Sequence, residues 1–252
     1  MRKFVVAVAL ISLAVLGMSA PGRADTITVT TGQSRFNELF DNQGWWDATF
    51  VILPTLRDNY IVGRCCESGE HRDFFTFDLS GLTLTAVSAS LEVRRFDGSS
   101  PDAFETLGLF EVTTDAAALN ANNGDVAAIF ADLGDGTSFG TFDIPTLGDR
   151  GAIVSLPLNA DGVAAINRSR GHFFSIGGRI LTLGTSTPNE FLFGNSTGAP
   201  SGGFSARLVV TAFPLPAQLD DCKSGGWSTH TDAHGTSFRN QGQCVAFVNH
   251  RP

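Results

Sequence analysis

The chain has 252 residues, with 17 lysines and arginines against 25 aspartates and glutamates, and a net charge of −8. Removing Met1–Ala24 takes away three basic residues and no acidic one, which changes the charge to −11. Such a chain has no basic surface for a phosphate backbone, so we expect no nucleic-acid partner. Because 42% of the residues are hydrophobic, a packed core is expected and a disordered protein is excluded.

The first 24 residues have the layout of a secretory signal peptide. Arg2 and Lys3 precede an apolar run from Phe4 to Leu16, and the segment ends with Gly22-Arg23-Ala24. This run is too short to span a membrane, and no later apolar run approaches ~18 residues, so no transmembrane helix is expected. The sequence therefore predicts a secreted protein, with the periplasm or the cell surface as alternative destinations.

Short apolar-alternating runs separated by turn residues predict β-strands along most of the chain. In Ala86–Phe96, Val87, Ala89, Leu91 and Val93 alternate with polar residues, as in a half-buried antiparallel strand. The predicted strands are Thr26–Thr31, Thr49–Leu53, Asn59–Gly63, Asp73–Leu79, Ala86–Phe96, Thr106–Val112, Thr137–Ile144, Gly151–Leu158, Gly171–Ile176, Glu190–Gly194 and Gly203–Ala212.

The spacing of these strands, about 8–12 residues, predicts an all-β protein with an antiparallel, jelly-roll-like β-sandwich. Two short helices are expected, at Thr114–Asn120 and Asn159–Ser169. A proline-containing segment from Phe213 ends the last strand, because proline cannot donate to a sheet ladder. We therefore predict a sandwich over residues 25–212, a linker over 213–221 and a small C-terminal tail over 222–252.

Several of these segments resemble a family of secreted bacterial β-sandwich proteins to which no function is assigned. A more distant resemblance is to DNRLRE-type domains, which are similar to carbohydrate-binding modules, although the DNRLRE hexapeptide itself is absent from this chain. The resemblance implies a sandwich without a catalytic motif. It rests on Asn59–Leu79, Ser88–Val93, Glu105–Leu119, Ile129–Gly140, Leu156–Ile166, Gly171–Gly178, Glu190–Gly194 and Ala206–Val210.

The tail resembles a C-terminal element found on diverse secreted bacterial proteins. It runs Cys-Lys-Ser-Gly-Gly-Trp from Cys222 and Asn-Gln-Gly-Gln-Cys-Val from Asn240. This resemblance implies a Cys222–Cys244 disulfide, one of the three pairings that four cysteines allow in an exported protein. For the adjacent Cys65 and Cys66, a strained vicinal disulfide, two thiols and cross-pairing with the tail all remain open.

No motif for catalysis is present, such as HExxH, G-x-S-x-G or a Walker A loop, and the sequence therefore indicates a protein that is not an enzyme. Metal binding has weak candidates. His230, Asp232 and His234 alternate, so an extended segment would point all three to one side. Asp132 and Asp135 lie in an oxygen-rich turn motif suited to a structural calcium, as do Asn122 and Asp125. A solvated turn is the alternative in each case.

Trp45, Trp46 and Tyr60 are the candidate ligand-binding residues, because sugar rings stack on exposed flat aromatic side chains. Core packing is the alternative, and adjacent tryptophans in a strand would point to opposite faces. Two functions follow from the sequence. The first is a secreted, non-catalytic module that binds polysaccharide or cell-envelope material. The second is a structural or adhesive extracellular protein with no small-molecule site, and a hydrolase is a distant third.

Overall fold

The computed structural model describes residues 24–32, 36, 41–47, 60–65, 69–121, 126–185, 189–194, 205–232 and 236–250. The chain divides into two compact units, one of Ala24–Leu215 and one that contains Pro216–Pro252. Within the described residues, no helix is long and apolar enough to cross a membrane. The predicted strand Thr49–Leu53 lies outside the described residues, as do Met1–Arg23 of the expected signal peptide.

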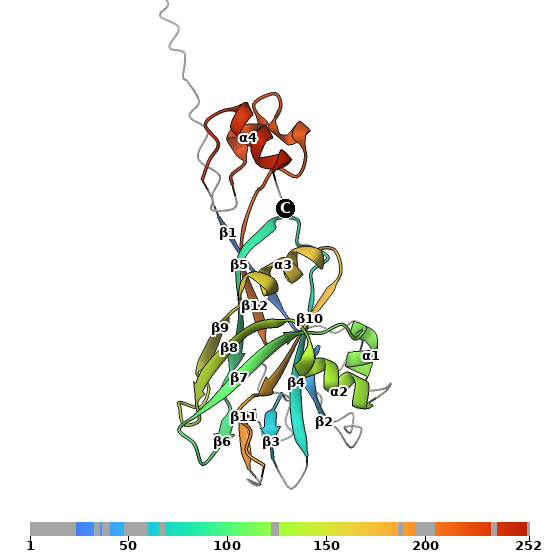
Figure 1. The fold of residues 1–252 in the computed structure, drawn as a ribbon, viewed down its shortest axis with the longest axis vertical. Coiled ribbons are helices and arrows are strands. Elements are labelled where there is room, and N and C mark those ends of the chain that lie inside the picture. Colours follow the sequence, from blue (N-terminus) through green and yellow to red (C-terminus); the bar gives the residue numbers. More distant parts are fainter. Residues whose placement is uncertain are drawn as a thin grey trace, which may run out of the picture. The chain divides into compact units, whose positions relative to one another are not determined.

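The Ala24–Leu215 unit is an antiparallel β-sandwich, which confirms the predicted fold class (Figure 1). The smaller sheet has the order β1 (Asp25–Thr30), β12 (Arg207–Phe213), β5 (Thr85–Arg94) and β9 (Ile153–Pro157). The larger sheet has the order β6 (Asp97–Ser99), β11 (Glu190–Gly194), β3 (Val62–Arg64), β4 (Glu70–Asp78), β10 (Phe173–Ile180), β7 (Phe104–Glu111) and β8 (Ser138–Pro145), and β2 (Gln43–Asp47) also pairs with β4.

The main hydrophobic core lies between the two sheets. Phe75, Phe77 and Leu79 enter it from one face of β4 and its end, as the period-two pattern predicts. Leu91 of β5 and Val210 of β12 enter it from the smaller sheet, and both are fully buried. Burial of these side chains from opposite sheets is the main favourable term that holds the sandwich together.

The predicted inward-facing pattern of β5 is wrong at the start of the strand, where the structure has a β-bulge. The ladder pairs Ser88 with Thr211 but Ala86 with Ala212, so Val87 is an extra residue without a partner on β12. As a result Ala86 is buried while Val87, which was predicted to face the core, is only half-buried. Beyond the bulge the predicted inward positions are buried as expected.

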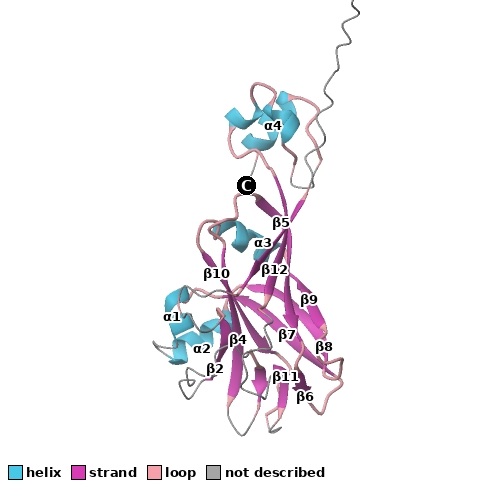
Figure 2. Cartoon of the chain, turned by 180° about the vertical axis from the view of Figure 1, so that it is seen from behind, coloured by secondary structure: helices cyan, strands magenta, loops and turns pink. Residues whose placement is uncertain are grey.

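In the described part of the Ala24–Leu215 unit, three helices accompany the sandwich, one more than the sequence predicted. The two predicted ones are α1 (Ala116–Ala121) and α3 (Ala160–Arg168), the latter capped by the Asn159 side chain. The helix that sequence reasoning missed is α2 (Val126–Asp135). Helices α1 and α2 lie beside β2, β4 and β10 in Figure 2. They cover a second apolar cluster on the outer face of the larger sheet.

Helix α2 packs so closely on β10 that only glycine fits at position 177. A Cβ atom there would lie 2.6 Å from the carbonyl oxygen and 2.8 Å from the Cα of Leu133, both backbone atoms of α2. We expect Gly177→Ala to lower the free energy of unfolding by about 1–3 kcal/mol, since the helix must move away from the sheet. Urea unfolding measures this. Gly81→Ala is the matched control, because no atom lies within 4 Å of its added Cβ, and an equal loss in both variants would contradict the prediction.

The Pro216–Pro252 unit is small and is built around the disulfide Cys222–Cys244. Its described elements are two short 3-10 helices, Leu219–Cys222 and Gly226–Thr229, and the helix α4 (Gln241–Asn249). The sequence did not predict α4. Both cysteines are fully buried with Phe238 in one cluster, and Trp227 packs against it. The disulfide implied by the tail resemblance is therefore present.

Candidate functional site

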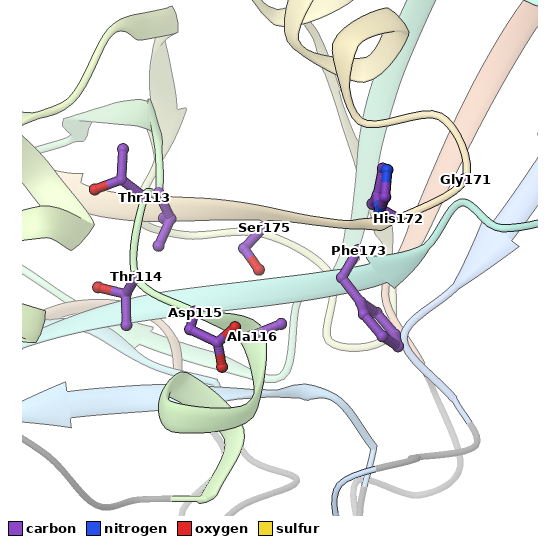
Figure 3. A pocket seen from close by; sticks show the side chains of 9 residues that line it. Thr113, Thr114, Asp115, Ala116, Gly171, His172, Phe173 and Ser175 are labelled. Atoms are coloured by element: carbon purple, nitrogen blue, oxygen red, sulfur yellow. The ribbon is translucent and has the colours of Figure 1, made fainter.

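A cleft of about 400 Å³ lies where the end of β7 meets the beginning of β10. Two segments far apart in the sequence line it, Val112–Ala116 between β7 and α1, and Gly171–Phe173 together with Ser175. They meet because β7 and β10 are antiparallel neighbours, with Glu111 opposite Ile176. Figure 3 shows Ser175 and Asp115 between the Thr113–Thr114 backbone and the ring of Phe173.

The Thr113–Thr114 wall of the cleft is held from behind by Asp132 of α2. The Asp132 carboxylate accepts both backbone N–H groups of the wall, from Thr113 at 2.9 Å and from Thr114 at 2.7 Å. It also accepts both threonine hydroxyls, at 2.8 Å and 2.7 Å. In Figure 3 these hydroxyls point away from Phe173. Four hydrogen bonds to one carboxylate fix the wall on the helix.

The floor of the cleft is a chain of buried polar side chains. The Ser175 hydroxyl is 2.8 Å from the Thr76 hydroxyl, and the Asn120 side-chain amide donates to Thr76 at 3.1 Å. The same amide donates to the carbonyl of Ala116 at 2.8 Å, which ties α1 to the floor. Either hydroxyl can be the donor between Ser175 and Thr76, because Thr76 keeps a second lone pair beyond the one that accepts from Asn120.

The rim carries the charged and aromatic groups. One oxygen of Asp115 caps α1 by accepting from the N–H groups of Ala117 and Ala118, at 2.9 and 3.3 Å. The exposed Asp115 is the one acidic residue of the described lining, which contains no lysine or arginine. His172 is exposed and Phe173 is half-buried, with its ring centroid 4.9 Å from that of Phe36.

Serine, histidine and aspartate thus line one cleft, but they do not form a catalytic triad. A triad needs the serine and the aspartate within hydrogen-bond reach of the same imidazole. His172 and Ser175 are an odd number of residues apart at the start of β10, so their side chains leave the strand on opposite faces. In Figure 3 the His172 imidazole points away from both Ser175 and Asp115. The Ser175 hydroxyl is instead engaged with Thr76.

The chain was compared with known proteins at the level of families and of individual sequences. No family model matches it, and no curated protein matches it either. The cleft therefore has to be interpreted from its own geometry.

The aromatic residues named from the sequence are core residues, so the predicted stacking platform is wrong for them. Trp45, Trp46 and Tyr60 are 8%, 1% and 0% exposed. Trp45 packs with Ile61 on one face of β2, and Trp46 packs under α2 on the other face. The Tyr60 hydroxyl donates to the Arg94 carbonyl and accepts from the Arg94 N–H, both at 2.9 Å.

The calcium turn predicted at Asp132 and Asp135 is also wrong, because both residues lie in α2. The Asp132 carboxylate is engaged by the cleft wall, and Asp135 accepts from Arg179 at 3.3 Å. The companion residues Asn122 and Asp125 lie outside the described residues. The described part of the chain contains no group of three His, Cys, Asp or Glu side chains that could hold a metal ion.

The tail histidines and the adjacent cysteines fall partly outside the described residues. His230 Nδ1 lies 2.8 Å from the Gly226 carbonyl, and Asp232 accepts from the Thr236 N–H at 2.8 Å, so both side chains take part in local turns. His234 and Cys66 lie outside the described residues. Cys65 is in a disulfide and packs with Trp45, which removes the alternative of a free Cys65 thiol.

Proposed function

We propose that the protein is an exported, non-catalytic module that binds a hydroxyl-rich ligand, foremost a polysaccharide, in the cleft between β7 and β10. The single observation that carries the proposal is the cleft itself, about 400 Å³ with hydroxyl, carboxylate and aromatic groups in its lining. Clefts of ~300–1,000 Å³ with a few convergent polar groups are the usual sites for small ligands.

The chemistry of the lining favours a ligand that donates hydrogen bonds. Asp115 has a second carboxylate oxygen beyond the one that caps α1, and this oxygen accepts from a ligand hydroxyl or amine. The Phe173 ring supplies an apolar surface for the C–H face of a sugar. Since the described lining of the cleft contains no lysine or arginine, an acidic polysaccharide would meet the Asp115 charge without compensation. A neutral or amine-bearing glycan therefore fits better.

The test is a glycan array probed with the full chain, followed by calorimetric titration of the best glycan. We expect Phe173→Ala and Asp115→Asn each to weaken binding about tenfold, the effect of roughly 1.4 kcal/mol. Asparagine caps a helix as well as aspartate does, so Asp115→Asn removes the charge and keeps α1. Leu147→Ala is the control, at a residue 86% exposed and outside the cleft lining. Unchanged affinity in both cleft variants would refute the site.

A different surface favours the alternative, a structural or adhesive extracellular protein without a small-molecule site. Phe104 is 57% exposed and Leu147 is 86% exposed. They are close in space, because Phe104 pairs with Pro145 and Thr146 donates to the Ala103 carbonyl. Exposed large apolar side chains that gather in this way often mark contact surfaces. Absence of binding to every glycan, with retention of the chain on the producing cell's envelope, would favour this alternative.

A further inference from the structure

Asp73 is a carboxyl group buried in the interior of the sandwich with little to stabilise its charge. It lies in β4, is 1% exposed, and its Oδ1 atom has no hydrogen-bond partner among the described residues. Burial raises the pKa of Asp73 from its usual 3.8 to about 7, opposed in part by a hydrogen bond from its own backbone. Glu105 is buried as fully, yet its two oxygens accept from the hydroxyls of Ser100 and Thr182.

The strand pair β4–β10 is shaped around this carboxyl group. Asp73 pairs with Gly178 across the ladder, and a Cβ atom at position 178 would collide with Asp73 Oδ1. The carboxyl group thus occupies the space that any side chain at 178 would fill. An apolar residue in its place would be the ordinary solution for a sandwich core, because an unpaired buried carboxyl is costly.

Among the described residues no ion pair reaches Asp73, although the charge of Arg94 acts on Tyr60, the phenol that also senses the charge of Asp73. On β2, Trp45 pairs with Asp73, and Asp47 pairs with His71. His71 on β4 has Nδ1 3.2 Å from the Gly63 carbonyl and Nε2 3.8 Å from Asp47. Burial lowers the pKa of His71, and Asp47 opposes this, so the imidazole is neutral near pH 7.

Three further elements complete the surroundings. Tyr60, before β3, has a pKa that is raised mainly by burial, lowered in part by its backbone hydrogen bond with Arg94 and by the Arg94 charge, and raised by the negative charge of Asp73. On β10 the facing residue is Gly178, and Leu107 of β7 lies beside it; neither titrates. An ionised Asp73 therefore has the Tyr60 phenol within electrostatic range and gains no described ion pair.

We propose that Asp73 is a proton-responsive element of the larger sheet: the pairing of β4 with β2 and β10 accommodates the protonated carboxyl group and weakens when this group is ionised. The difference in the pKa of Asp73 between the folded and the unfolded chain sets how the free energy of unfolding changes with pH. The stabilising contribution of Asp73 is complete below the usual carboxyl range and is lost as the pH rises through its raised pKa. His71 has the opposite sign, because its lowered pKa costs stability as the pH falls.

The same two strands carry the floor of the cleft. Thr76 and Ser175 form a ladder pair three residues from Asp73 and Gly178, and their side chains point to the other face of the sheet. Ionisation of Asp73 is therefore expected to loosen the hydrogen-bonded floor as well. This gives the exported protein a response to the pH around it that does not depend on what the cleft binds.

The test compares unfolding of the full chain with that of Asp73→Asn, in urea, between about pH 4.5 and pH 8. Asparagine has the size of the protonated carboxyl group and does not ionise. We expect the ratio of the unfolding constants, wild type over variant, to rise by about tenfold per pH unit until it levels off near pH 7, and His71 cancels in this ratio. Asp149→Asn, at an exposed carboxylate, should give a ratio that does not change. A pH-independent ratio for Asp73→Asn would overturn the proposal.

A second measurement needs only the wild-type chain and follows the titration of Asp73 directly. Carbon-13 NMR of the Asp73 carboxyl group in the wild-type chain is expected to titrate with a midpoint about three pH units above that of an exposed aspartate. Amide exchange, expressed as protection factors, is expected to fall for β2, β4 and β10 as that midpoint is passed. A midpoint in the ordinary aspartate range, or unchanged protection factors in these three strands, would overturn the proposal that Asp73 responds to pH.

Discussion

Replacing Trp46 with alanine is expected to lower the free energy of unfolding of the Ala24–Leu215 unit by about 3–5 kcal/mol. Trp46 is 1% exposed and is the largest member of the cluster that joins β2 and β4 to the helices. Its ring packs with Phe74 of β4 and with Ile129 and Leu133 of α2. The alanine variant leaves a cavity between sheet and helix that neither rigid element collapses to fill.

Urea unfolding followed by circular dichroism measures the loss, and amide exchange locates it. We expect α2 to lose protection before the smaller sheet does, because Trp46 contacts the helix and not the main core. Phe104→Ala is the matched control, since this aromatic side chain is 57% exposed and its removal should cost less than about 0.5 kcal/mol. A loss at Trp46 no larger than at Phe104 would show that α2 does not depend on this side chain.

The tryptophan pair shows how far a sequence pattern reaches. Alternation correctly places Trp45 and Trp46 on opposite faces of β2, in two separate clusters. It does not say whether a face is covered. One face is covered by α2 and the other by residues of β11 and the segment before β3. Such cover comes from elements distant in the sequence, so both rings are buried and the predicted platform is not formed.

Helix α2 was missed because its end has the residues of a turn. The run from Asp132 to Gly136 contains two aspartates and two glycines, which are turn formers in isolation. The helical signal was present, since Val126, Ile129, Phe130 and Leu133 recur at i, i+3, i+4 and i+7. Tertiary packing decides between the two: Arg72 donates to the Phe130 carbonyl at 2.9 Å, and Arg179 donates to Asp135.

The position and lining of the cleft could not be predicted from the sequence. Thr113, Asp115 and Ser175 carry no motif, and their approach depends on the register of β7 with β10. From the sequence, Asp132 is a weak candidate ligand for calcium because its carboxylate lies in an oxygen-rich motif. Its actual partners are the amides and hydroxyls of Thr113 and Thr114. The Asp132 carboxylate accepts four hydrogen bonds. A residue type that suggests a metal ligand in the sequence therefore fixes the wall of the cleft on α2.

Replacing Cys222 with serine is expected to unfold the Pro216–Pro252 unit under conditions in which the sandwich stays folded. The disulfide to Cys244 closes a segment with a sequence separation of 22, for which the chain-entropy model gives about 3 kcal/mol. The apolar cluster around it is small. Among the described residues of this unit, Phe238, at 8% exposed, is the one fully apolar side chain that is buried, while Trp227 and Phe247 are half-buried. A unit of this size rarely supplies enough hydrophobic burial to fold without a cross-link.

Amide exchange of α4 and limited proteolysis after Lys223 and Arg239 report on this unit, while urea unfolding reports on the sandwich. We expect the variant to lose protection throughout α4 and to be cleaved at both sites, with the sandwich transition unchanged. The Cys222→Ser/Cys244→Ser double variant is the matched control, because it removes the unpaired thiol that the single variant leaves at Cys244. Protection of α4 equal to that of the wild type in both variants would mean that contacts such as the Phe238–Phe247 pair, with ring centroids 5.3 Å apart, hold the unit without the disulfide.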